Sequence, residues 1–401
     1  MIAELRINFA IQILEEFKVL DIPLSRYLSS WFKLHPKAGS KDRRILSDLV
    51  YSYFRCYHWL MGISTREKLM SSYFLMGYED PGILDLLFSR NSSLKPLESG
   101  EGSLHQRKDT LTLLYPEIRW ESIFPWIPFL SPEIKAEDIE FSLIHQPRVF
   151  IRLQEAYIAS LKIALKERNI AFEEMGPYCW AFDSRTSLNS LKEGELKAAF
   201  EIQDYSSQRT GDFFKAEVRS NWWDCCAGGG GKSLLLSQMY PGTNLWSSDS
   251  RFSVLSNLEK RFMESGYPTP RTFVQDLLAE ENLPFREGFF DGIIYDAPCT
   301  GSGTWSRTPE RLGNFHPASL GRITDIQRRI GDKVYPYLNP GGYLIYITCS
   351  VFKAENEEIV DYLMDRYSMS LENQEYLNGT HIGADTLFVA RLKKNSLENT
   401  L

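Results

Sequence analysis

The chain has 401 residues, of which 43% are hydrophobic and 24% are charged, and its formal net charge is −7 at pH 7. This length exceeds what one domain usually needs, and the composition is that of soluble globular proteins, so we expect two or three domains with sizeable cores. No run of 18 apolar residues occurs, which argues against a membrane-spanning protein. The start of the chain alternates charged and apolar residues without a cleavage site. It predicts an amphipathic helix rather than a signal peptide, and a cytoplasmic location.

The first part of the chain, residues 1–135, is predicted to be a helical domain. Ser40 precedes a long apolar-periodic run and is expected to be the N-cap of a helix, with Asp42 in its first turn. A stretch rich in serine, glycine and charge at residues 91–108 predicts a loop. The proline-punctuated residues 124–132 predict a connection rather than a regular element.

Two stretches are locally basic although the whole chain is acidic. Residues 33–55 contain six basic and two acidic residues, and residues 302–335 contain six basic and three acidic residues. A nucleic-acid-binding protein is usually basic, but a local basic face can act alone. These stretches therefore indicate either a nucleic-acid-binding face or an ordinary solvated helix surface.

The middle of the chain, residues 140–205, is predicted to be a small α+β unit. It should contain a strand at residues 148–153, a helix at 156–168, short strands at 171–172 and 180–182, and a second helix at 187–197.

In the last part, residues 206–401, predicted strands and helices alternate. This alternation predicts an α/β domain with a mostly parallel sheet and helices on both of its faces. Ligands of such sheets bind beyond the carboxyl ends of the strands. The expected buried strands are residues 222–226, 245–249, 272–275, 292–296 and 342–347.

A glycine-rich turn, from Asp224 to Ser233, follows the first of these strands and leads into a helix. Its glycines let a ligand approach the backbone closely, and the helix N-terminus favours a negatively charged group. A phosphate-binding P-loop also ends in Gly-Lys-Ser, but that motif requires a glycine where this chain has Cys226. The turn could instead be a methyl-donor site, in which the backbone holds the carboxylate of S-adenosylmethionine, or a purely structural turn.

Three aspartates follow, at the ends of successive predicted strands. Asp249 comes about 20 residues after the turn, a spacing that suits hydrogen bonds from ribose hydroxyls. Asp276 ends the third strand and is expected to bind the adenine amino group, and Asp296 ends the fourth strand. The alternative for each aspartate alone is a turn cap.

Two of the six cysteines, Cys299 and Cys349, each follow a predicted buried strand at the edge where a ligand is expected. No Cys-x-x-Cys spacing occurs, so no metal site is predicted and the thiols are expected to be reduced. A lone cysteine is usually a small buried hydrophobe, but two thiols beside a methyl-donor site favour covalent catalysis. One thiolate would add to carbon 6 of cytosine and activate carbon 5, and the second thiol would help release. Lys232 is a candidate cation for the attacking thiol.

These motifs resemble those of the NOL1/NOP2/Sun family of RNA 5-methylcytosine methyltransferases. The matching segments are residues 202–208, 224–233, 296–303 and 338–357, and together the motifs cover most of residues 145–395. The resemblance implies a Rossmann-like class I methyltransferase domain that uses S-adenosylmethionine and no metal. It also implies that Cys349 attacks the base and that Cys299 assists release, while Lys232 and Asp296 polarise the cytosine. The donor contacts that it implies are Cys226, Ala227, Gly228, Gly229, Gly230, Gly231, Lys232, Asp249, Asp276 and Asp296.

The helical region at residues 34–60 resembles, more loosely, the NusB-like domain of bacterial RsmB-type 16S rRNA enzymes. This implies ribosomal RNA as the substrate, with the α+β unit as an RRM-like platform. Trp305 is then a candidate for stacking on a base, and a core position is the alternative. The chain has a Thr348-Cys349 pair in addition to Pro298-Cys299, and the resemblance implies that enzymes with both pairs act on RNA rather than DNA. The chain is expected to act as a monomer.

The chain departs from the family pattern at Gly228 and Gly229, where alanine and proline are usual, which predicts a looser turn and weaker donor binding. Three points stay open. The substrate RNA could be 23S rRNA or tRNA. A methyltransferase for a small molecule or a protein would need the donor site but neither cysteine. A non-catalytic assembly factor would bind RNA without the donor.

Overall fold

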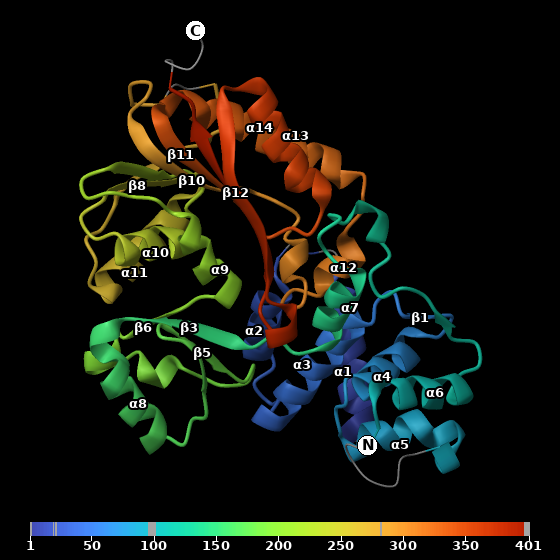
Figure 1. The fold of residues 1–401 in the computed structure, drawn as a ribbon. Helices are drawn as coiled ribbons and strands as arrows, with labels where there is room; N and C mark the ends of the chain where they lie inside the picture. The colour runs from blue at the N-terminus through green and yellow to red at the C-terminus, as the bar shows by residue number, and fades with distance from the viewer. Residues whose placement is uncertain (1, 19, 21, 95–101, 281–282, 397–401) are drawn as a thin grey trace. The chain divides into compact units, whose positions relative to one another are not determined.

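The computed structural model describes residues 2–18, 20, 22–94, 102–280 and 283–396 (Figure 1). The chain divides into two compact units. The first comprises Met1–Ile127, Ile139–His145 and Trp305–Phe315, and the second comprises Pro128–Asp138, Gln146–Thr304 and His316–Leu401. The division into three domains at 1–135, 140–205 and 206–401 stays a prediction. Within the described residues, no helix is both long enough and apolar enough to cross a membrane.

The first unit is largely helical, as predicted. Buried residues Ile7 and Leu14 of the first helix pack with helix α3, which buries Leu46 and Leu49. An antiparallel pair joins strands β1 and β2. The elements are α1 Ile2–Phe17, α2 Leu24–Leu34, α3 Ser40–Arg55, β1 Leu60–Met61, α4 Thr65–Leu75, α5 Pro81–Leu87, α6 Leu104–Leu114, β2 Arg119–Trp120, most of α7 Ala136–Ile144, and α12 Glu310–Asn314.

Local predictions for this unit are partly corrected. Ser40 is the first residue of α3 and not its N-cap; the cap is Gly39, and no side chain caps the helix there. Asp42 lies in the first turn as predicted, and it accepts hydrogen bonds from Arg6. The predicted loop at 91–108 is helical from Leu104, because Ser103 and Gln106 form a capping box; its residues 95–101 lie outside the described residues.

Arg55 is buried, although its stretch of sequence is basic. Its side chain lies inside the first unit with 3% exposure. The guanidinium donates to the backbone carbonyls of Leu143, His145 and Ser306, at 2.8, 3.3 and 2.6 Å. Arg55 therefore joins α3 to two other backbone segments of the first unit and does not belong to an exposed basic face. Lys33, Lys37, Lys41, Arg43 and Arg44 are exposed.

The second unit contains a four-stranded antiparallel sheet in the order β4-β5-β3-β6. Leu161 and Leu165 of helix α8 belong to the same hydrophobic cluster as Trp180 of the sheet. The predicted second helix at 187–197 is wrong: two short 3-10 turns stand there, and Gly194, at φ +55°, ends any regular helix. The elements are β3 Val149–Leu153, α8 Ile158–Glu167, β4 Glu173–Gly176, β5 Cys179–Phe182 and β6 Phe200–Ile202.

A seven-stranded sheet forms the rest of this unit, in the order β12-β13-β11-β10-β7-β8-β9. The pairs among β11, β10, β7, β8 and β9 are parallel, whereas β13 runs antiparallel to both β11 and β12. The strands are β7 Asn221–Asp224, β8 Asn244–Asp249, β9 Arg271–Val274, β10 Phe290–Asp296, β11 Leu338–Thr348, β12 Met369–Asn378 and β13 Thr386–Lys394. The prediction of a mostly parallel sheet is confirmed.

Helices cover both faces of this sheet (Figure 1). On one face Ile294, Ile345 and Ile347 form a core with leucines of α10 and α11. On the other face the hydroxyl of Tyr295 donates to the carbonyl of Gln327 in α13, at 2.8 Å. The helices are α9 Tyr205–Arg209, α10 Gly231–Met239, α11 Phe252–Ser265, α13 Ser319–Val334 and α14 Glu357–Arg366.

The strand register brings the ends of the parallel strands to one edge. Asp224 pairs with Ser247, and Asp296 pairs with Ile347. The residues that follow β7, β8, β10 and β11 therefore all emerge at the carboxyl edge, where ligands of such sheets bind.

Candidate active site

The glycine turn connects β7 to the first turn of α10. Gly228 and Gly230 adopt left-handed backbone conformations, with φ of +50° and +78°, and Gly230 is the N-cap of the helix. The N–H of Gly228 donates to Oδ2 of Asp249 at 3.1 Å, and that of Gly230 donates to the carbonyl of Ala227 at 2.8 Å. A Cβ on Gly230 would lie 2.5 Å from Cγ of Leu258. Glycine at position 230 is therefore required both by conformation and by the closeness of α11.

The turn fits an anionic group of a ligand. The N–H groups in the first turn of α10 have no intrahelical carbonyl to bind, and the helix N-terminus carries partial positive charge. A Cβ built on Gly228 meets no atom within 4 Å, so space lies open beside the turn. The residues here suit the carboxylate of a bound methyl donor.

Asp249 stands at the end of β8 beside the turn, as predicted. Its carboxylate accepts from Nε and Nη2 of Arg251, at 2.9 and 3.1 Å, and from the N–H of Gly228. Burial raises the pKa of Asp249, but the hydrogen bonds from Arg251 and Gly228 outweigh it and leave the pKa lowered. Asp249 therefore stays ionised and can accept further hydrogen bonds.

Asp276 differs from the other aspartates. Strand β9 ends at Val274, so Asp276 lies beyond the strand and not at its end as predicted, and Asp276 is exposed. Its Oδ1 accepts from the N–H of Leu278 at 2.9 Å, so the aspartate caps a turn, which is the alternative to a ligand contact. Its proposed contact with adenine stays a prediction.

The two predicted catalytic cysteines lie side by side. Cys299 follows β10 and Cys349 follows β11, and their Sγ atoms are 3.4 Å apart; both are partly exposed. The hydrogen bond with Cys349, followed by burial, raises the pKa of Cys299 well above its ordinary value. At neutral pH Cys299 therefore keeps its proton.

Lys232 and Asp296 form an ion pair at the same edge, with Nζ 2.6 Å from Oδ2. Burial lowers the pKa of Lys232, but the nearby Asp296 and then Cys349 outweigh burial, so the pKa is raised. Lys232 is thus a permanent cation near Cys349. The structure brings together the four residues predicted to be catalytic.

A buried carboxylate that the sequence analysis did not single out joins the two cysteine loops. Glu355 accepts from the N–H and hydroxyl of Thr300, at 2.7 and 2.6 Å, and from the hydroxyl of Ser350. Thr300 follows Cys299 and Ser350 follows Cys349, so Glu355 fixes the spacing of the two thiols. A signal was present, since Glu355 begins the Glu-Asn-Glu part of the matching segment 338–357, but its role needs the fold.

Glycine at position 303 allows a second close contact between these loops. Its N–H donates to the carbonyl of Cys349 at 2.9 Å, and a Cβ there would lie 1.9 Å from the carbonyl oxygen of Thr386.

Trp305, the candidate for stacking on a base, is a core residue of the first unit. It is 1% exposed and packs against the rings of Phe124, Trp126 and Phe315, so it does not stack on a base.

The strand order, the glycine turn after β7 and the carboxylate after β8 define a Rossmann-like fold of the S-adenosylmethionine-dependent methyltransferase class. The family described as 16S rRNA methyltransferase RsmB/F matches residues 214–393, and this part of the chain is a methyltransferase domain of that family. The resemblance to the NOL1/NOP2/Sun family is thereby confirmed.

Individual relatives agree with this assignment. Ribosomal RNA small subunit methyltransferase F of Cronobacter sakazakii is 41% identical over 83 residues, which are 21% of this chain and 17% of that protein. The match thus spans less than a fifth of that relative's length.

Solved structures share the fold. The crystal structure of PH0851 has a TM-score of 0.67 at 16% identity and covers 97% of this chain and 98% of that one. The structure of NSun6 from Pyrococcus horikoshii with SFG has a TM-score of 0.56 at 17% identity, over 65% of this chain and 94% of that one. At these identities the likeness is one of fold.

Proposed function

We propose that this protein transfers a methyl group from S-adenosylmethionine to carbon 5 of cytosine in RNA, through a covalent bond to Cys349. The observation that carries the proposal is the pair of thiols 3.4 Å apart beside the Lys232–Asp296 ion pair. A methyltransferase for a small molecule or a protein would have no use for two thiols at this edge. We further propose 16S rRNA as the substrate, supported by the matching family and by the name of the Cronobacter sakazakii relative.

The residues that would hold the donor lie around the glycine turn. The backbone from Cys226 to Lys232 would bind the methionine carboxylate, and Asp249 would accept from the ribose hydroxyls. Asp276 and Asp296 would lie along the rest of the donor. When bound, S-adenosylmethionine would supply an electrophilic methyl carbon, and the sulfonium sulfur would keep the electron pair of the broken bond as S-adenosylhomocysteine.

Cys349 supplies the nucleophile. Its thiolate forms a bond to carbon 6 of the cytosine, and the electron pair of the 5,6 double bond moves to carbon 5, which takes the methyl group. The ion pair of Lys232 and Asp296 polarises the ring while this charge develops. Loss of the carbon 5 proton to a base and cleavage of the sulfur–carbon 6 bond restore the double bond and free the Cys349 sulfur.

The raised pKa of Cys299 supports different roles for the two thiols, with Cys349 as the nucleophile and Cys299 as the group that assists release. A Cys299 that keeps its proton does not compete with Cys349 for the base. Its sulfur lies 3.4 Å from that of Cys349, so during release it can give its proton to the departing Cys349 sulfur and then, as a thiolate, accept the carbon 5 proton. This agrees with the roles that the family resemblance implies, attack by Cys349 and release assisted by Cys299.

Two variants test the proposal with unmodified 16S rRNA and labelled donor. Cys349→Ala should abolish formation of 5-methylcytosine, because no sulfur remains to attack. Cys299→Ala should accumulate a protein–RNA adduct that survives a denaturing gel, because attack continues while release fails. Cys179→Ala, which removes a buried thiol of β5, is the matched control and should behave as wild type. Full activity of Cys349→Ala would refute the proposed nucleophile.

The identity of the RNA is tested separately. Bisulfite sequencing of RNA from a deletion strain should reveal one lost 5-methylcytosine in 16S rRNA. A lost site in 23S rRNA or tRNA instead would leave the chemistry intact and correct the substrate.

A further inference from the structure

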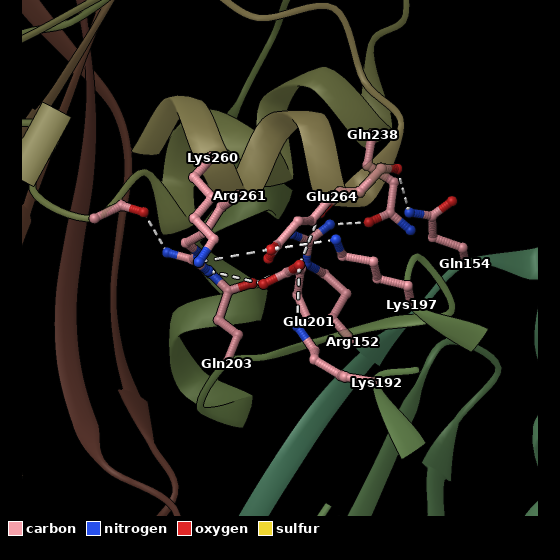
Figure 2. A network of polar contacts seen from close by, with 12 residues as sticks. Arg152, Gln154, Lys192, Lys197, Glu201, Gln203, Gln238, Lys260, Arg261 and Glu264 are labelled. Carbon is pink, nitrogen blue, oxygen red and sulfur yellow. Dashed lines mark hydrogen bonds and ion pairs between the residues drawn. The ribbon is translucent and has the colours of Figure 1, made fainter. Parts of the chain in front are cut away.

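The glycine turn at the donor site has few contacts of its own to hold its shape. Residues Gly228–Gly231 carry no side chains, and two of them adopt left-handed conformations. Glycine loses more conformational freedom on ordering than other residues do. The shape of this turn must therefore be held by groups outside it, and Figure 2 shows where these groups come from.

Arg261 of helix α11 reaches the turn directly. Its Nη1 donates to the carbonyl of Gly229, and its Nη2 donates to Oε2 of Glu201 at 3.0 Å. A Cβ on Gly229 would lie 3.3 Å from Nη1. The guanidinium thus takes up the space beside Gly229, and its planar fork bridges the turn and a carboxylate.

Glu201 is itself fixed, so it can orient Arg261. It lies in β6 and is 8% exposed, and it also accepts from the hydroxyl of Ser265 at 2.7 Å. Lys192 lies 3.4 Å away (Figure 2). Burial raises the pKa of Glu201, but Lys192, Ser265 and Arg261 together leave it lowered. Glu201 therefore stays ionised and holds the guanidinium with a charge-assisted hydrogen bond.

A second link runs parallel to the first. Nε2 of Gln203 donates to the carbonyl of Gly231 at 3.3 Å, and Oε1 of Gln203 accepts from Nε of Arg152 at 2.8 Å. Arg152 belongs to β3 and is 5% exposed. Both links connect the four-stranded sheet to the turn, so the small sheet contributes to the shape of the donor site.

We propose that Arg261, oriented by Glu201, is a positioning residue that holds Gly228–Gly231 in the conformation that binds the donor. This inference rests on the proposed function in one respect, that the ligand of the turn is S-adenosylmethionine. It assigns Arg261 to donor affinity and not to the chemical step, because the guanidinium contacts the backbone of the turn and not the two thiols.

Amide hydrogen exchange and calorimetry test this role in the full chain. In Arg261→Met, the amides of Gly228 and Gly230 should exchange several-fold faster without ligand, while those of β8 stay unchanged. The Kd for S-adenosylmethionine should rise about tenfold, and kcat at saturating donor should change little. Arg261→Lys should give a smaller rise in Kd, since one ammonium group cannot span both acceptors.

Two further variants serve as controls for the role of Arg261. Lys260→Met removes an exposed cation of the same helix and should leave both measurements unchanged. Arg261→Met combined with Glu201→Gln also removes the charge of the carboxylate that has lost its arginine, and its Kd should equal that of Arg261→Met alone. Wild-type exchange and wild-type Kd in a folded Arg261→Met protein would overturn the inference. If the wild-type protein binds no S-adenosylmethionine, the proposed function fails, and amide exchange still decides whether Arg261 holds the turn.

Discussion

Asp224, the last residue of β7, is a buried acid with an incomplete set of partners. It is 1% exposed, and its Oδ2 accepts from the hydroxyl of Ser233 at 2.6 Å. Its Oδ1 has no hydrogen-bond partner among the described residues. Burial, with a smaller contribution from Asp296, raises the pKa of Asp224 from 3.8 to about 7. A carboxylate at this position opposes folding once it is charged.

Replacing this acid should change how stability depends on pH. A raised pKa in the folded state means that the contribution of Asp224 is full below about pH 4 and is lost as the pH rises through about 7. Asp224→Asn stays neutral, so its free energy of unfolding should not fall across this window. At pH 8 the variant should be more stable than wild type by roughly 2–4 kcal/mol, because each pKa unit corresponds to about 1.4 kcal/mol.

Urea denaturation at several pH values between 4 and 8 measures the effect. Asp365→Asn changes an exposed aspartate of α14 and should run parallel to wild type throughout. Parallel curves for wild type and Asp224→Asn would show that Asp224 is ionised without cost.

Residues that directly follow the strands of the parallel sheet could be identified from the sequence as site residues. Cys299 and Cys349 come together because both follow strands of one parallel sheet, and the order of the motifs was enough to pair them. Exposure could not be predicted in the same way. Arg55 belongs to a basic stretch of sequence, and for Trp305 the sequence left stacking on a base and a core position open, but both side chains are buried among segments that are distant in sequence. Charge and aromaticity identify a residue type, while tertiary packing decides which face it occupies.

At the scale of elements, the ends of β10 and β11 depend on Glu355 for their spacing. Glu355→Ala should lower the free energy of unfolding by about 2–4 kcal/mol, because it removes three hydrogen bonds from a buried site between the two loops. The rate of methyl transfer should fall with it, since the two sulfurs would no longer be held 3.4 Å apart. Chemical denaturation and single-turnover assays measure the two effects.

The matched control is a glutamate on the same segment. Glu358 is exposed and pairs with Lys353 only at 3.8 Å, so Glu358→Ala should change stability by no more than about 0.5 kcal/mol. Equal free energies of unfolding for the two variants would show that the hydrogen bonds of Glu355 with Thr300 and Ser350 do not stabilise the fold.

The elements themselves were predictable where their pattern is strong. Five predicted runs became the parallel strands β7, β8, β9, β10 and β11. Four of them are largely buried, because strands buried on both faces leave long apolar runs. The prediction that the third strand is buried is wrong: β9 lies at the edge of the sheet and none of its residues is buried. The hairpin of β12 and β13 was not predicted: β12 is half exposed, so its sequence lacks such a run. The false helix at 187–197 has enough apolar residues for a helix, but Gly194 interrupts it.

For the whole molecule, the net charge of −7 conflicts with binding a polyanion unless the basic residues are gathered. The described structure keeps Lys37, Lys41, Arg43 and Arg44 exposed on and just before α3 of the first unit. In the second unit, Arg322 and Arg329 of α13 are exposed. The start of α3 therefore offers a local basic surface in spite of the overall charge, whereas on α13 the exposed Asp325 lies between the two arginines.

Binding of RNA should then weaken as salt rises, because each phosphate that the protein neutralises releases a counterion. The double variant Lys37→Gln, Lys41→Gln should lower RNA affinity and should flatten the plot of log affinity against log salt by about 0.7 for each phosphate that is no longer neutralised.

The control variant Lys166→Gln, Lys353→Gln removes the same charge from exposed sites elsewhere in the chain, so any effect of net charge alone appears in both proteins. Fluorescence anisotropy with a labelled single-stranded RNA from 50 to about 300 mM salt supplies the slopes. A flatter slope for the Lys37→Gln, Lys41→Gln protein than for the Lys166→Gln, Lys353→Gln protein would place phosphate binding at the start of α3. Identical slopes would assign the attraction to net charge and remove this surface from the binding face.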